Sequence, residues 1–261
     1  MAASLSVVVV GASGDLAKKK TYPALFDLFS HGHLPMDVTI IGVARSALTD
    51  ESLRGQLRTY LEKLSGGVPE LIDLFLSRCA YRQMKSYADL EAMTSLDQHL
   101  TVAEAAHPSG VANRLFYFAI PPNVFLDTAA TIKASAVSAS GFTRLIVEKP
   151  FGHHLKRAQE LAAALGAIFD EDHIYRIDHY LGKEMVQNMI VMRFGNVLFR
   201  NVWDRRSISS VQITFKEDFG TMGRGGYFDN YGIIRDIMQN HLMQVGFGCS
   251  SFFVFKQTIV A

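Results

Sequence analysis

Two segments of the sequence carry side chains that could perform acid–base and phosphate chemistry. Residues 176–184 bring together an acid, an imidazole, a phenol and an amine, which are Asp178, His179, Tyr180 and Lys183. Cationic and hydroxyl donors are the groups that bind phosphate, so this mixture suits a phosphorylated sugar. The second segment supplies His241, whose imidazole titrates in the range needed to accept a proton from an alcohol. On spacing alone, a single helical histidine is more often structural than catalytic.

A glycine motif near the N-terminus predicts a site for a dinucleotide. Gly11 to Ala17 have the form G-x-x-G-x-x-A, directly after the β-branched run Ser6 to Val10. Glycine lets the backbone approach a pyrophosphate, and the amides at a helix N-terminus bind the phosphate charge. The predicted strand before the motif and the predicted helix after it supply the context that the motif requires. A tight turn that binds no ligand is the alternative.

Arg45 and Ser46 follow the second predicted strand, where NAD-binding domains usually place an acid for the ribose hydroxyls. An arginine suits a 2′-phosphate instead, so Arg45 favours NADP. The interval from the glycines is longer than the usual spacing of about 20 residues, and a solvated surface arginine is the alternative. Three consecutive lysines, Lys18 to Lys20, cannot all point one way on a helix, so at most one is expected near the cofactor.

Alternating strands and helices must position these groups. Short apolar runs predict strands at 6–10, 38–43, 115–120 and 144–147. Helices are expected between them, with Thr49 as the N-cap of one and Pro23 marking a fresh first turn within another. This order predicts an α/β fold, a Rossmann-type doubly wound parallel sheet over residues 1–150. Ligands of such sheets bind at the carboxyl ends of the strands, where Lys149 could hold a substrate oxygen or phosphate.

The pattern changes after residue 150. Helices are expected at 155–169 and from within the mixed polar segment 174–182, followed by a half-buried strand at 210–216. A helix at 232–245 should place its isoleucines, Met238 and Leu242 on an apolar side. These elements indicate the start of a second, α+β domain over residues 151–245.

The composition places no strong constraint on partners. The 261 residues carry 26 basic and 25 acidic side chains, a net charge of +1. This balance gives no reason to expect nucleic acid or an anionic membrane as partner. The two cysteines form no CxxC pair and no zinc-binding spacing occurs, so neither a disulfide framework nor a metal site is expected. No apolar run is long enough to span a membrane, and a cytoplasmic location is the default expectation.

Several longer segments together resemble glucose-6-phosphate dehydrogenase. They follow the family pattern in order from about Val7 to Val245, and they are GASGDLAKKK, NRLFYFAIPP, IVEKPFG, RIDHYLGKE, TFKEDFGTMGRGGYFD and GIIRDIMQNHL. The segment RIDHYLGKE is highly specific to that family. The resemblance implies an NADP-dependent dehydrogenase that oxidises glucose 6-phosphate at C1 to 6-phosphogluconolactone, the first step of the oxidative pentose phosphate pathway.

The resemblance also implies a role for each site residue. His241 is the base that takes the C1 hydroxyl proton, and Asp178 orients its imidazole. The residues implied for the substrate phosphate are His179, Tyr180 and Lys183, and those for the sugar hydroxyls are Lys149, Glu217 and Asp236. The residues implied for the coenzyme are Gly11, Ser13, Gly14, Asp15, Leu16 and Arg45, with Lys149 near the nicotinamide end.

Family members are about twice as long as this chain and form homodimers or homotetramers. Residues 246–261 do not resemble the family, so the second domain is expected to be incomplete and the tail unrelated. Two interpretations follow: a sugar-phosphate dehydrogenase, or a catalytically inactive truncated isoform or gene-model fragment that at most binds NADP. An unrelated NADP-sensing protein ranks last, because it does not account for the acid, the imidazoles and the amine named above.

Overall fold

A computed structural model describes residues 3–63, 68–149, 151, 154–177, 180–216, 220–221 and 225–249. By contact, the chain forms two compact units, residues 1–177 and 178–261. No helix within the described ranges combines the length and the apolar character needed to cross a bilayer.

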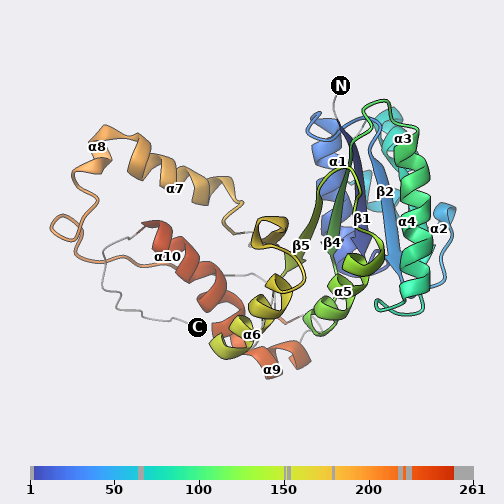
Figure 1. The fold of residues 1–261 in the computed structure, drawn as a ribbon. Helices are drawn as coiled ribbons and strands as arrows, with labels where there is room; N and C mark the ends of the chain where they lie inside the picture. Colours follow the sequence, from blue (N-terminus) through green and yellow to red (C-terminus); the bar gives the residue numbers. More distant parts are fainter. Residues whose placement is uncertain are drawn as a thin grey trace. The chain divides into compact units, whose positions relative to one another are not determined.

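Six parallel strands form the sheet of the first unit, in the order β3-β2-β1-β4-β5-β6 (Figure 1). Their bounds are β1 (Ser4–Val10), β2 (Thr39–Ala44), β3 (Cys79–Gln83), β4 (Ala112–Phe118), β5 (Thr143–Glu148) and β6 (Ile174–Ile177). The chain first adds strands on one side of β1 and then crosses to β4 on its other side. This reversal is the hallmark of a doubly wound sheet, and the predicted α/β class is confirmed.

Helices cover both faces of this sheet. The first face packs against α1 (Tyr22–Ser30), α2 (Asp50–Leu61) and α3 (Pro69–Ser77). The opposite face packs against α4 (Leu90–Ala105), α5 (Phe125–Ser135) and α6 (Leu155–Gly166). Within β1, Val7 and Val9 belong to the first core and Val8 and Val10 to the second. Because both faces are buried, β1 is a continuous apolar run rather than an alternating one.

A capping residue and a proline mark the starts of two helices, as the sequence predicts. The Thr49 hydroxyl accepts a hydrogen bond from the Ser52 amide at 3.1 Å and caps α2. Acidic residues occupy the first turn of α2, where they suit the helix dipole. A π-helical turn, η1 (Ala17–Thr21), precedes α1, and Pro23 lies in the first turn of α1, where its missing amide costs no helical hydrogen bond.

The sheet continues past the boundary at residue 150 that the sequence predicts. α6 follows that boundary, and β6 pairs with β5 in a register that runs from Leu145 with Ile174 to Glu148 with Ile177. The prediction that segment 174–182 is a lead into a helix is therefore wrong for its first four residues. β6 is an edge strand with two exposed residues in its centre, so its apolar signal is weak.

The second unit is helical within the described residues. Its helices are α7 (Glu184–Gly195), α8 (Val197–Arg200), α9 (Gly225–Ile233), the π-helix η4 (Ile234–Leu242) and α10 (Met243–Cys249). The strand predicted at 210–216 is absent there, because no described segment pairs with it. A strand needs such a partner for its backbone N–H and C=O groups.

The helix predicted at 232–245 differs from the structure in two ways. Gly232 has a φ of +73° and kinks α9 one residue before its end, and η4 then follows with i→i+5 hydrogen bonds instead of an α-helical pattern. The expected apolar side is also wrong in part, since Ile233 and Ile234 are each 54% exposed whereas Asp236 and His241 are buried.

Candidate functional site

The glycine loop lies at the carboxyl end of β1 and is tied to β2. The amides of Gly11 and Ala12 donate to the Val43 carbonyl at 2.7 and 3.2 Å. Within the described part of the chain, the amides of Ser13, Asp15 and Leu16 donate to no backbone carbonyl. These are the unpaired groups expected where a helix begins, and they can bind a phosphate.

Gly11 occupies a backbone position that other residues fit poorly. Its φ is +90°, and a Cβ added there would lie 2.3 Å from the Ala119 carbonyl oxygen. The loop therefore passes against the end of β4 with no space for a side chain. This close approach is the structural reason for glycine at the first position of the motif.

We expect the substitution Gly11→Ala to lower the free energy of unfolding by about 1–3 kcal/mol, because it combines backbone strain with overpacking. Gly55→Ala is the matched control: Gly55 lies on α2, and an added Cβ meets no atom within 4 Å. That change should stabilise the chain by about 0.5–1 kcal/mol. Urea unfolding followed by circular dichroism measures both values, and equal shifts of the two midpoints would contradict this account of the loop.

Arg45 directly follows β2 and lies beside the glycine loop. The hydroxyls of Ser13 and Ser46 are hydrogen-bonded at 3.0 Å, which links the two segments directly. The Tyr81 hydroxyl donates to the Ser46 carbonyl at 2.6 Å, and burial raises the pKa of this phenol, which keeps it a donor. The exposed Arg45 guanidinium lies 5.8 Å from the centre of the Tyr87 ring.

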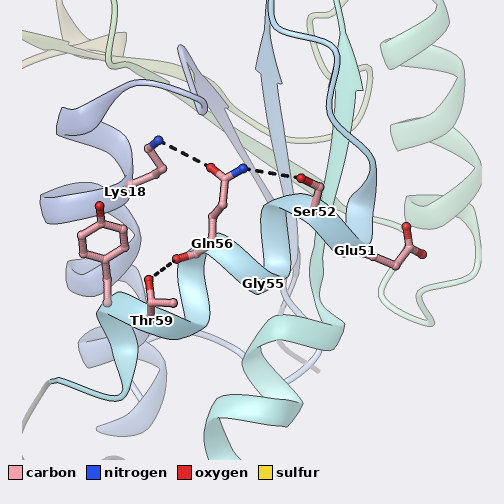
Figure 2. Close-up of a pocket in the computed structure, with 7 residues that line it drawn as sticks. Lys18, Glu51, Ser52, Gly55, Gln56 and Thr59 are labelled. Atoms are coloured by element: carbon pink, nitrogen blue, oxygen red, sulfur yellow. Dashed lines mark hydrogen bonds between the residues drawn. The ribbon is translucent and has the colours of Figure 1, made fainter.

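The lysines of η1 differ in their surroundings. The Lys19 amine bonds the Asp15 carboxylate at 2.8 Å, and this hydrogen bond lowers the pKa of that exposed carboxyl. The Lys18 amine donates to the Gln56 side chain at 3.5 Å, at the rim of a pocket of about 430 Å³ beside α2 (Figure 2). None of the predicted coenzyme residues lines this pocket. The solvated character predicted for most of the lysine run is confirmed for Lys19 and Lys20.

Lys149 directly follows β5. The Tyr117 hydroxyl donates a short hydrogen bond to the Glu148 carboxylate, and burial raises the pKa of Tyr117 well above its ordinary value. The phenol therefore stays protonated and fixes the last residue of β5. Glu148 pairs with Ile177, so β5 and β6 end next to each other in the sheet. In the sequence, Lys149 follows β5 and Asp178 follows β6.

In the second unit, two predicted site residues, His241 and Lys183, lie against the ring of a third, Tyr180. The rings of Tyr180 and His241 stack with 4.0 Å between centroids and 21° between planes. The Lys183 amine lies 3.8 Å from the centre of the Tyr180 ring. The His241 side chain is buried, and Asp236 is also buried on the same π-helix. An imidazole, an amine and a carboxylate thus occur in one unit, which is a set suited to proton transfer next to an anionic group.

Three predicted site residues, Asp178, His179 and Glu217, lie outside the described residues. The structure does describe residues that sequence reasoning missed. Tyr81 and Tyr87 support the end of β2, and Tyr117 holds the end of β5. Tyr117 alternates with the buried Phe116 and Phe118 along β4 and so lies on the opposite face of the strand from them, but nothing in the sequence names its partner. Among the described residues, no group of three or more metal-binding side chains occurs.

Comparison with protein families accounts for this arrangement. The family model for the glucose-6-phosphate dehydrogenase NAD-binding domain matches residues 8–188. The model for the C-terminal domain of the same family matches residues 190–247. The chain belongs to the glucose-6-phosphate dehydrogenase family.

Curated relatives and solved structures agree with this membership. The chain is 52% identical over 250 residues to glucose-6-phosphate 1-dehydrogenase 5, cytoplasmic, of Arabidopsis thaliana, with 93% of this chain and 48% of that protein covered. It is 50% identical over 245 residues to glucose-6-phosphate 1-dehydrogenase 3, chloroplastic, of the same plant, with 93% and 40% covered. A solved glucose-6-phosphate dehydrogenase in complex with its substrate glucose-6-phosphate has a TM-score of 0.90 at 46% identity, with 96% of this chain and 52% of that chain covered.

The chain spans about half the length of the curated glucose-6-phosphate dehydrogenases it matches. Within this half, the model of the NAD-binding domain matches residues 8–188 and the model of the C-terminal domain matches residues 190–247. The glycine loop, Arg45 and the cluster around Tyr180 all fall within it.

Proposed function

We propose that this chain is an NADP-dependent dehydrogenase that oxidises glucose 6-phosphate at C1 to 6-phosphogluconolactone. The observation that carries the proposal is the buried imidazole of His241, stacked on Tyr180 beside the Lys183 amine. A histidine base next to a cationic phosphate-binding group is what this reaction needs. The solved relative in complex with glucose 6-phosphate supports the choice of substrate.

The coenzyme is proposed to bind at the carboxyl ends of β1 and β2. When bound, NADP supplies the hydride acceptor for the reaction. The glycine at position 11, with its positive φ, and the unpaired amides of Ser13, Asp15 and Leu16 suit a pyrophosphate. Gly14 keeps this loop free of a further side chain, and the exposed guanidinium of Arg45 suits a 2′-phosphate. These features support NADP as the cofactor.

The roles of the substrate residues are proposed from the family pattern. His179, Tyr180 and Lys183 bind its phosphate, whereas Lys149, Glu217 and Asp236 bind the sugar hydroxyls. His241 accepts the proton of the C1 hydroxyl through a ring nitrogen. Asp178 accepts a hydrogen bond from the other ring nitrogen and stabilises the imidazolium that forms, as the acid of a catalytic triad does. The reaction requires the nicotinamide and the imidazole to reach the same carbon of the sugar.

The oligomeric state of the chain and its location in the cell are proposed from its similarity to the family. Homodimers or homotetramers are proposed from the family pattern. A cytoplasmic location is supported by the relative that is named cytoplasmic, while a chloroplastic relative of similar identity offers the plastid as the alternative.

Spectrophotometric detection of NADPH tests the proposal directly. The purified chain with NADP should form NADPH from glucose 6-phosphate. Glucose should be used with a kcat/KM lower by about 10- to 10²-fold or more, because charge-assisted hydrogen bonds to the phosphate are then lost. A chain that binds NADP without forming NADPH would instead be the coenzyme-binding fragment of the second interpretation. A folded chain that binds no NADP would contradict the proposed dehydrogenase.

A further inference from the structure

Tyr180 is the centre of a cluster of side chains in the second unit. The His241 ring stacks on it at 4.0 Å, and the Lys183 amine lies 3.8 Å from its centroid. Phe215 meets it edge-on at 5.7 Å. Each of these three contacts is made with the phenol ring. The ring therefore touches both the proposed base and a cation proposed to bind phosphate.

The helix that carries His241 buries two of its polar residues. Asp236 and His241 are five residues apart on η4, and both are buried, while Ile234 is 54% exposed. In an α-helix, two such positions would point about 140° apart around the axis. The i→i+5 hydrogen bonds of a π-helix instead place the second position about one turn beyond the first. η4 thus presents Asp236 and His241 on a shared side, and Tyr180 covers the imidazole of His241.

We infer that Tyr180 is a positioning residue for His241, and that its ring rather than its hydroxyl performs this role. The inference rests on the proposed function, in which His241 is the base. A stacked ring occupies one face of the imidazole and leaves its two nitrogens at the edge, where proton transfer takes place. Such a contact fixes the direction of both nitrogens at once, which matters because a base must approach its proton within hydrogen-bonding distance.

Two substitutions distinguish this role of the ring from that of a hydroxyl that only donates to the substrate phosphate. Tyr180→Phe retains the ring and removes the hydroxyl, whereas Tyr180→Leu removes both. If the ring positions His241, the phenylalanine variant should lose only the phosphate contact of the hydroxyl, whereas the leucine variant should also lose the position of His241. If the hydroxyl is what matters, the two variants should be impaired alike.

The first measurement is the acylation rate of His241 by diethyl pyrocarbonate, read by mass spectrometry of its peptide. Because His241 has no exposed surface, the wild-type chain and Tyr180→Phe should react slowly at this position. Tyr180→Leu should react at least about tenfold faster, since it opens the covered face to solvent. Tyr175→Leu is the matched control, because it removes a half-exposed tyrosine from the first unit and should leave the rate unchanged.

The second measurement is the kinetics of glucose 6-phosphate oxidation by the same variants. Tyr180→Phe should raise KM, because it loses one proposed hydrogen bond to the substrate phosphate. Tyr180→Leu should raise KM as well and should also lower kcat by about 10²-fold relative to Tyr180→Phe, as misplacement of a reacting group does. If the wild-type chain shows no turnover, the proposed function fails for this chain, and the acylation rates still decide the positioning role.

Two results would overturn the inference. One is a phenylalanine variant as impaired, or as rapidly acylated, as the leucine variant. The other is a folded leucine variant in which His241 stays as protected as in the wild type. Should the leucine variant fail to fold, the phenylalanine variant decides by itself: protection of His241 as in the wild type supports the ring, and a loss of that protection refutes it.

Discussion

Replacing His241 with glutamine is expected to lower kcat for glucose 6-phosphate oxidation by about 10²- to 10⁴-fold, the usual contribution of a positioned general base. Glutamine can still donate and accept hydrogen bonds in the buried site, but it cannot take up the hydroxyl proton. The dissociation constant of NADP should stay unchanged, because the coenzyme residues lie in the other unit of the chain.

His99→Gln is the matched control for this substitution. His99 is an exposed histidine on α4, and its ring lies 3.4 Å from the Arg82 guanidinium. It has no place in the proposed chemistry, so its replacement should leave kcat within about twofold of the wild type. Steady-state kinetics at saturating substrate, together with a coenzyme titration, measure both variants. If the two substitutions reduced kcat equally, His241 would not be the base.

Arg45→Glu should reverse the coenzyme preference of the chain. The change removes charge-assisted hydrogen bonds to the 2′-phosphate, worth about 1.5–3 kcal/mol, and adds like-charge repulsion. The dissociation constant of NADP should therefore rise by about 10²- to 10³-fold. NAD has no 2′-phosphate, and a carboxylate at this position can accept hydrogen bonds from its ribose hydroxyls. The dissociation constant of NAD should consequently stay level or fall.

Lys20→Glu provides the control for net charge. Lys20 is an exposed residue of η1, and its replacement changes the total charge of the chain by the same amount. Fluorescence titration of both variants with NADP and NAD separates a local effect from a general one. An equal loss of NADP affinity in the two variants would mean that Arg45 acts only through the overall charge.

The sheet was predictable where both of its faces are buried. β1, β2, β4 and β5 are runs of apolar residues that end at glycine, proline or polar residues, and the structure places strands at each. β6 was not predictable, because an edge strand with exposed residues such as Tyr175 has little apolar periodicity. The sequence pattern changes at residue 150, whereas the first compact unit by contact extends to Ile177.

Prediction was weaker in the second unit, where local periodicity does not decide the structure. The alternation at 210–216 looks like a strand, but a strand exists only when another segment pairs with it. At η4 the sequence suggests an apolar helical side, yet Asp236 and His241 are the buried residues. A functional face that buries polar groups contradicts the pattern that amphipathic helices follow.

Part of the candidate site could likewise be predicted from the sequence, and part could not. The glycine motif and Arg45 could be named from their order along the chain, because parallel strands bring their carboxyl ends to one edge of the sheet. The ring of Tyr180 on His241 joins residues far apart in sequence, and no spacing rule predicts that contact. Its partners in the proposed chemistry, Asp178, His179 and Glu217, remain predictions from family resemblance, since they lie outside the described residues.

Transfer of isotope from the sugar to the coenzyme tests the central claim most directly. The chain should be incubated with NADP and glucose 6-phosphate that carries deuterium at C1, and both products should be analysed by mass spectrometry. The account predicts deuterium in NADPH and none in the 6-phosphogluconolactone or in the 6-phosphogluconate formed by its hydrolysis. In His241→Gln this transfer should be slower by about 10²- to 10⁴-fold. Folded chain that binds NADP and glucose 6-phosphate but moves no deuterium to the nicotinamide would contradict it.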